Sequence, residues 1–335
     1  MLPLVAVLVA CAGADDFRAT GICTPVTTGT KVPRGTQVPS GAASVLLERG
    51  GTYAVTPRNG LTVGAYGSGQ NPRINSQAVN GRGNIRYDNV DVPSVSGGGS
   101  GAGGPITVTN SRLGGTAISI NTTGVFNTGP PWTVACNYIG TPGLGANSDS
   151  CILMLSPNST VAGNKISGCG GGLPYGTHGV YAKAENVRIA GNTVSNIRNG
   201  QAFSIRMRGA LVEYNRYDGT GYGAAIDWYG QGPASHAGGT IEIRNNDFTM
   251  IPMWLDPTDA ACSQAGCGGN TMNWKIHHNR LRPRSGSAGR PAVTGGVKPG
   301  VVSRWEITDN DMAGFGSASS PNPRPSSLVE SRNKF

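Results

Sequence analysis

A short apolar phrase recurs along most of the chain and separates stretches rich in glycine, serine and proline. Each copy has an aliphatic residue, two variable residues, asparagine or a substitute, one variable residue and a second apolar residue. Nine copies occur, with fourth positions at Asp88, Ser111, Asn137, Asn164, Asn192, Asn215, Asn246, Asn279 and Asn310. Their irregular spacing, 23 to 33 residues, and the absence of long 3.6-residue patterns argue against a helical solenoid.

Each phrase instead predicts two short strands joined by a one-residue corner. Asparagine tolerates the left-handed backbone of such a corner, and asparagines stacked on successive coils can hydrogen-bond to one another. The sequence therefore predicts an all-β chain whose asparagines lie in one line along a rod. The pattern resembles the right-handed parallel β-helix of pectate-lyase-like proteins, which implies a single-stranded helix of about ten coils with an Asn ladder.

Four regions follow from this pattern. We expect a signal peptide at residues 1–14, an N-terminal cap at 15–41, the parallel β-helix at 42–316 and a proline-containing C-terminal tail at 317–335. Capping of the exposed coil ends is a general need of repeat folds.

The first residues are typical of an export signal, because an apolar run from Leu2 to Ala10 precedes small residues. Two processing hypotheses compete. Cleavage after Ala14 would leave Asp15 first, whereas a lipobox-like Leu8-Val9-Ala10-Cys11 would place a lipid on Cys11. We expect a secreted or periplasmic protein, lipid-anchored in the second case.

Composition and charge narrow the class further. Charged residues are 13% and hydrophobic residues 37% of the chain, which excludes a solvated disordered chain. No apolar run reaches the roughly 18 residues of a membrane span, so no transmembrane segment is predicted. The net charge of +9 favours an anionic partner, and the scattered basic residues argue for an anionic polysaccharide rather than nucleic acid. We expect a monomer.

Six cysteines remain after the predicted signal, an even number that permits disulfides in an exported protein. Cys262 and Cys267 lie in one glycine-rich loop and are the favoured pair. The sequence leaves the connectivity of Cys136, Cys151 and Cys169 open. No CxxC or Cys/His zinc spacing is present.

Three coils can be aligned on the strand before the asparagine corner. Val180, Phe203 and Ile226 are apolar and 23 residues apart, so they are expected to point inward and their neighbours outward. The expected outward columns are Tyr181, Ser204 and Asp227, then Lys183, Arg206 and Tyr229, then Glu185, Arg208 and Gln231. Trp254 and Asp256 are expected to continue this surface.

The stacking of Lys183 on Arg206 is the most informative feature of these columns. Side chains on adjacent strands lie about 5 Å apart, where like charges repel by roughly 1 kcal/mol in water and about 3 kcal/mol at an effective dielectric of 20. An anion bound between them would relieve this repulsion, and the neighbouring cation favours a neutral, basic Lys183. The alternative is that Asp227 and Glu185 neutralise a solvated face, with Arg208 paired to Glu185.

The two coils read Y-A-K-A-E-N-V-R-I-A-G-N, with Lys183, and S-I-R-M-R-G-A-L-V-E-Y-N, with Arg206. They resemble the alginate lyase and chondroitinase B family of polysaccharide lyases, in which a Lys base and an Arg lie one coil apart. The resemblance implies β-elimination on a uronate polymer, with Lys183 and Arg206 catalytic. Family members commonly hold calcium on acidic residues upstream of the Lys; Gly176 to Gly179 carries none, so no cofactor is expected.

The remaining site candidates have supporting roles. His178 or Tyr229 would protonate the leaving oxygen, while Tyr181 and Trp254 offer faces for sugar stacking. Arg208 and Asp227 are expected to bind substrate. His277 and His278 belong to another sheet and are interpreted as structural.

Two other functions stay open at this stage. A glycoside hydrolase of the polygalacturonase type would use paired carboxylates, for which Asp227, Asp256 and Asp259 are the candidates. A non-catalytic polysaccharide-binding or adhesin rod would need the basic groove and the aromatic residues but no base. The fold alone does not decide among these functions.

Overall fold

The computed structural model describes residues 21–97, 102–114, 118–119, 129–140, 150–169, 178–198, 200–219, 226–228, 239–255, 271–295, 302–322 and 324–335. Regular structure in these ranges consists of β-strands alone. They contain no helix long and apolar enough to cross a lipid bilayer.

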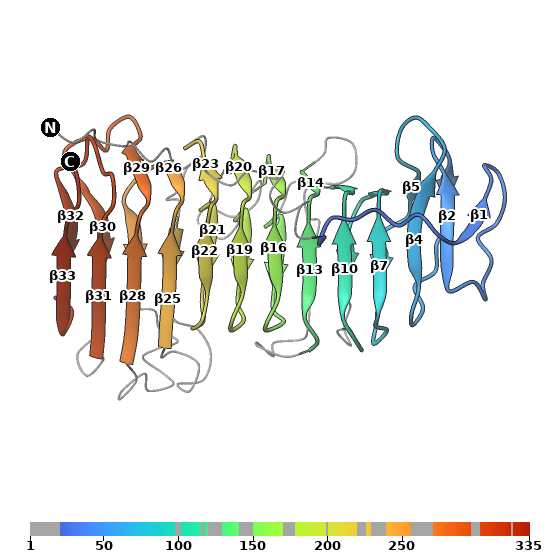
Figure 1. Cartoon of the computed structure of the whole chain (residues 1–335), viewed down its shortest axis with the longest axis horizontal. Helices are drawn as coiled ribbons and strands as arrows, with labels where there is room; N and C mark the ends of the chain where they lie inside the picture. Colours follow the sequence, from blue (N-terminus) through green and yellow to red (C-terminus); the bar gives the residue numbers. More distant parts are fainter. Residues whose placement is uncertain are drawn as a thin grey trace, which may run out of the picture.

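The strands form three parallel sheets along the molecule, and each coil from β4 to β30 contributes one strand to each sheet in turn (Figure 1). Sheet A stacks β1 (Thr30–Val32), β2 (Ser44–Glu48), β4 (Thr62–Tyr66), β7 (Ile85–Asp88), β10 (Ile106–Thr109), β13 (Trp132–Ala135), β16 (Thr160–Ala162), β19 (Arg188–Ala190), β22 (Leu211–Glu213), β25 (Gly239–Arg244), β28 (Thr271–His277), β31 (Val302–Thr308) and β33 (Ser327–Ser331). This arrangement confirms the predicted parallel β-helix.

The other two sheets follow the same order along the rod. Sheet B stacks β3 (Thr52–Tyr53), β5 (Arg73–Ile74), β8 (Asp91–Val92), β11 (Arg112–Leu113), β14 (Tyr138–Ile139), β17 (Lys165–Ser167), β20 (Thr193–Ser195), β23 (Arg216–Tyr217), β26 (Asp247–Met250) and β29 (Arg280–Pro283). Sheet C stacks β6 (Gln77–Ala78), β9 (Val95–Ser96), β12 (Ile118–Ser119), β15 (Ile152–Met154), β18 (Val180–Ala182), β21 (Phe203–Ile205), β24 (Ile226–Trp228), β27 (Met253–Leu255), β30 (Pro291–Gly295) and β32 (Ser317–Pro321).

The core is a set of inward-facing columns built from the aliphatic residues of the repeated phrase. Val134, Val161, Ile189, Val212 and Ile243 pair in register on sheet A and are fully buried. β-branched side chains suit this stack because they fill a pleated surface with few rotamers to lose. The alternation of apolar and polar positions in each strand therefore fixes which residues face outward.

The predicted Asn ladder is confirmed. From Asn137 to Asn310, the backbone N–H and the side-chain Nδ2 of each asparagine donate to Oδ1 of the next asparagine in the row. The distances are 2.9–3.1 Å. Asn333 adds one more rung beyond Asn310. All the predicted ladder residues are buried, so their amides satisfy backbone groups that water cannot reach.

The corner differs from the sequence prediction in one respect. The left-handed residue is the one before each asparagine, such as Cys136, Gly163 or Tyr214, rather than the asparagine itself. The fourth position of the first phrase, Asp88, lies outside the ladder. Asp88 pairs in register with Thr109 and accepts its hydroxyl at 2.8 Å, because the left-handed corner of this coil is Asn89.

Two disulfides lie within the described part of the chain. Cys23 bonds to Cys136 and Cys151 bonds to Cys169. The first joins the N-terminal segment to the corner after β13, where Cys23 packs with Ala135, Ala162 and Ala190 on the outer side of sheet A. The favoured Cys262–Cys267 pair lies outside the described residues, as do the predicted signal and the Cys11 lipid site.

The N-terminal segment crosses the outer face of sheet A before it joins the stack (Figure 1). Its backbone accepts from Asn110 at Cys23 O (3.0 Å), and the Val26 N–H donates to Asp88 (2.9 Å). Gly64 makes room for it, because a Cβ there would lie 3.0 Å from Val26. We call residues 23–30 the strap.

Strands continue to the end of the described chain. β32 and β33 lie in the region expected to form a tail, and β33 pairs with β31 over five residues. The stack therefore extends beyond the ten coils expected from the nine phrases.

Candidate functional site

Sheet C carries the outward columns that the sequence placed there. Tyr181 pairs with Ser204, Ser204 with Asp227, and Asp227 with Trp254. The Arg206 N–H donates to Ala182 O at 2.9 Å, which sets Arg206 beside Lys183 on the adjacent coil. The register derived from Val180, Phe203 and Ile226 is confirmed by the pairing of these three residues.

The aromatic ring of Tyr181 is the meeting point of the candidate site. The Lys183 ammonium lies 4.3 Å from the ring centroid, and the Arg206 guanidinium carbon lies 4.8 Å from it. The His178 ring contacts the same tyrosine edge-on, with 4.6 Å between centroids. Four predicted site residues are therefore brought together, and two cations share one electron-rich ring.

Arg206 is on the outer side of its strand, yet its side chain is only 5% exposed. Its Nη1 donates to Ile205 O at 3.3 Å. The guanidinium adds a positive charge to the surroundings of Tyr181. With Lys183 half-buried next to it, this part of sheet C attracts an anion.

His178 is fully buried and is held in one tautomer. The Gln201 backbone N–H donates to Nδ1 at 3.2 Å, so the neutral ring carries its proton on Nε2. Burial, followed by the positive charge of Arg206 and to a smaller extent that of Lys183, lowers the pKa of His178 to about 3, and only the Gln201 side chain acts in the opposite direction. At neutral pH the ring is thus an uncharged hydrogen-bond donor and not an imidazolium acid.

Sequence reasoning missed a group of buried polar atoms beside Tyr181. Among the described residues, His178 Nε2, Gln201 Oε1 and Ser204 Oγ have no hydrogen-bond partner, although the atoms are shielded from water. Such groups are costly to bury, and a polar ligand would satisfy them. Ser204 was identifiable from its outward column, but no sequence signal distinguished Gln201.

Other predicted residues lie apart from this cluster or outside the description. Arg208 forms a salt bridge with Glu185 at 2.9 Å, as the alternative interpretation expected. Trp254 is 48% exposed and lies two strands from Ser204 on sheet C. Tyr229, Gln231, Asp256 and Asp259 are outside the described residues, and of Asp227 only the backbone register is described.

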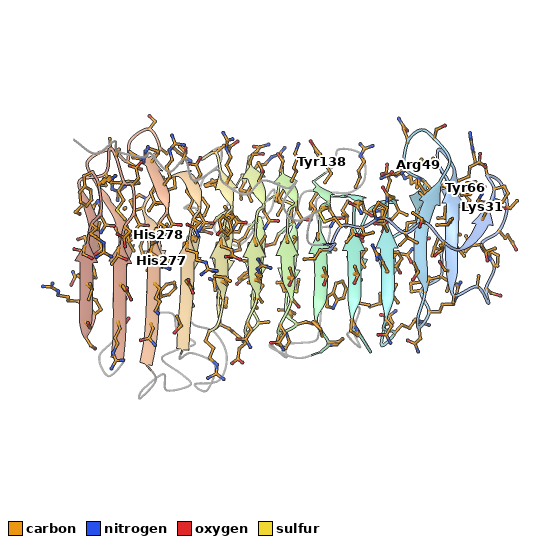
Figure 2. The ribbon with its side chains drawn as sticks, in the orientation of Figure 1. Lys31, Arg49, Tyr66, Tyr138, His277 and His278 are labelled. Carbon is orange, nitrogen blue, oxygen red and sulfur yellow. A yellow bond between two sulfur atoms is a disulfide. The ribbon has the colours of Figure 1, made fainter. Side chains whose placement is uncertain are left out.

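No metal centre emerges in the ranges that the structure describes. They contain no group of three or more His, Cys, Asp or Glu side chains arranged to hold an ion. His277 is the last residue of β28 on sheet A, and His278 follows it (Figure 2). His277 Nε2 lies 3.1 Å from Glu242, and the two Nδ1 atoms are 2.9 Å apart.

The buried state of His178 predicts a pH-dependent stability. In the unfolded chain His178 takes up a proton near pH 6.5, whereas in the fold it stays neutral down to about pH 3. The free energy of unfolding should therefore fall with decreasing pH across this window, by up to about 1.4 kcal/mol per pH unit from this residue. Urea unfolding at a series of pH values should show a shallower slope for His178→Gln. His277→Gln is the control, and equal slopes for wild type and His178→Gln would contradict the prediction.

No family model and no curated protein sequence matches the chain. One solved structure is similar, the crystal structure of an alginate lyase from Paenibacillus sp. str. FPU-7. The match covers 87% of this chain and 92% of that chain, with 14% sequence identity and a TM-score of 0.38. At that TM-score the likeness carries no weight for function.

Proposed function

We propose that this protein is a polysaccharide lyase that cleaves an acidic, uronate-containing polysaccharide by β-elimination. The observation that carries the proposal is the convergence of Lys183 and Arg206 on Tyr181, at 4.3 and 4.8 Å from its ring. Two cationic side chains that lie together over one ring suit a substrate that carries a carboxylate group. The net charge of +9 supports the same substrate class.

The reaction needs three things at one sugar. A cation must stabilise the negative charge that develops on the carboxylate, a base must remove the proton from the adjacent carbon, and the leaving oxygen must receive a proton. The carbon–hydrogen electrons then form the new carbon–carbon double bond as the carbon–oxygen bond breaks. Arg206 suits the first role, since its planar fork binds a carboxylate through two hydrogen bonds. Lys183 in its neutral form is the proposed base.

The neighbouring residues have supporting roles in this proposal. Neutral His178 offers Nε2–H as a donor, and Ser204 offers a hydroxyl, to oxygen atoms of the bound sugar. Tyr181 holds both cations and presents an aromatic ring to substrate. Tyr229 remains the proposed proton donor to the leaving oxygen, because the His178 ring is neutral at neutral pH and so is not an imidazolium acid.

A substrate panel tests the proposed function. Alginate, polygalacturonate and glycosaminoglycans should be incubated with the full chain, and cleavage should produce the ultraviolet absorbance of unsaturated uronate ends. New reducing ends without that absorbance would indicate a hydrolase. Retention on a polymer column with no cleavage would indicate a binding rod, and either result would overturn the lyase proposal.

A further inference from the structure

A row of exposed side chains runs along sheet B, on a different side of each coil from the candidate site. Tyr138, Lys165, Thr193 and Arg216 pair in register on four consecutive strands, and all four are exposed. Figure 2 shows Tyr138 beside β14 at the upper edge of the view. Strand spacing of about 4.8 Å makes this row about 14 Å long.

The charges in the row are not balanced as they are elsewhere on the same sheet. Arg112 pairs with Asp91 at 3.5 Å, and Arg280 pairs with Asp247 at 3.0 Å. Lys165 and Arg216, which lie between those two pairs, make no ion pair with any described residue. The row is therefore a short cationic stretch, and the charged residues on either side of it are neutralised in ion pairs.

An aromatic platform and small hydroxyl groups accompany the two cations. Tyr138 is 55% exposed, and the Lys165 ammonium lies 5.3 Å from its ring centroid. In the neighbouring outward column, Ser167 and Ser195 lie side by side with their hydroxyl oxygens 3.0 Å apart. Asp218 follows Ser195 in that column and ends the hydroxyl pair. We call Tyr138, Lys165, Thr193, Arg216, Ser167 and Ser195 the sheet-B strip.

We propose that the sheet-B strip is a second binding site, separate from the candidate active site, for an extended strand of acidic polysaccharide. Lys165 and Arg216 match carboxylates two strands apart, the exposed face of Tyr138 suits a sugar ring, and the serine and threonine hydroxyls suit sugar hydroxyls. The proposal rests on the proposed function only for the choice of polymer.

The strip would raise the affinity for long chains without taking part in cleavage. A polymer held on sheet B and on sheet C of the same rod dissociates more slowly than one held on sheet C alone, because the second contact is intramolecular. Short oligosaccharides cannot engage both faces, so the strip should not affect them. This difference between long and short ligands separates binding at the strip from catalysis.

Charge reversal with a matched control tests the proposal. The double variant Lys165→Glu/Arg216→Glu should bind immobilised alginate or polygalacturonate at least about tenfold more weakly than the parent. Lys31→Glu/Arg34→Glu changes the net charge equally, on exposed residues at the N-terminal end of the rod, and should stay within about twofold. All three proteins carry Lys183→Ala in this assay so that polymer is not consumed. In the chain with Lys183 intact, the strip variant should cleave short oligouronates at the parental rate.

Several results would overturn the inference. These are no binding of either polymer, equal losses in both charge-reversal variants, or tighter binding of duplex DNA than of polyuronate through the strip. Loss of binding through the strip in a protein that forms no unsaturated ends would leave the inference standing and remove the proposed lyase activity. If the strip variant binds and cleaves long polymer as the parent does, the proposed lyase activity would stand and the inference about the strip would be overturned.

Discussion

Lys183→Ala should reduce eliminative cleavage of the preferred polyuronate by about 10²- to 10⁴-fold, the usual contribution of a positioned general base. The reason is geometric. Lys183 lies beside Arg206 over one ring, so its amine is next to the place where Arg206 would hold a carboxylate. The initial rate of ultraviolet absorbance increase, measured at saturating substrate, checks this prediction.

Lys165→Ala is the matched control for that variant. Lys165 also lies over a tyrosine ring, at 5.3 Å from the centroid of Tyr138, but on sheet B. Its loss should leave the saturated rate of cleavage within about twofold, because it touches none of the proposed reacting groups. A Lys183→Ala protein that folds normally and retains full activity would refute the site, even if the lyase reaction itself is found.

Asn192→Ala should lower the free energy of unfolding by about 4 kcal/mol, since each buried polar group left without a partner costs about 1–3 kcal/mol. Asn192 Oδ1 accepts from the Asn164 backbone at 3.0 Å and from its side chain at 2.9 Å. Its Nδ2 donates to Val161 O and to Asn215 Oδ1, both at 2.9 Å. Alanine would remove these partners from the Asn164 donors and the Val161 carbonyl in the middle of the rod, while Asn215 Oδ1 would keep the backbone N–H of residue 192.

Guanidinium unfolding followed by circular dichroism measures this loss. Thr193→Ala is the control, because Thr193 is the exposed neighbour in the same coil and its change should fall within about 0.5 kcal/mol. A cost for Asn192→Ala as small as that of the control would show that the ladder adds little to stability.

The repeated phrase was sufficient to predict the fold, because a two-residue alternation and a polar corner are local properties. The alignment of Val180 with Phe203 followed from their spacing and proved right. The left-handed position was misplaced by one residue, since the sequence shows asparagine at the corner but not which residue carries the strained φ. Asn333 was missed because it lies in a region whose prolines suggested a tail.

The candidate site could be predicted only in part. The outward columns placed Tyr181, Lys183 and Arg206 together, because residues in register on adjacent strands must be neighbours. Burial could not be read in the same way, since an outward position on a strand is exposed unless another segment covers it. The neutral state of His178 follows from that burial and from the nearby cations, and neither is visible in the sequence. The Cys23–Cys136 bond, with 113 residues between its ends, was equally beyond local patterns.

The length of the strap limits the number of coils that fit between β1 and β13. From Thr30 in β1 to β13, beside which Cys136 binds Cys23, sheet A has five strand spacings, or about 24 Å. The seven residue steps from Cys23 to Thr30 span at most about 25 Å when fully extended. The disulfide adds reach, because the Cα atoms of Cys23 and Cys136 are 6.1 Å apart, little more than one strand spacing. Insertion of several coils before β13 would therefore require a longer strap, whereas coils inserted beyond β13 would leave it undisturbed. Growth of this rod by duplication of coils is thus restricted mainly to its C-terminal part.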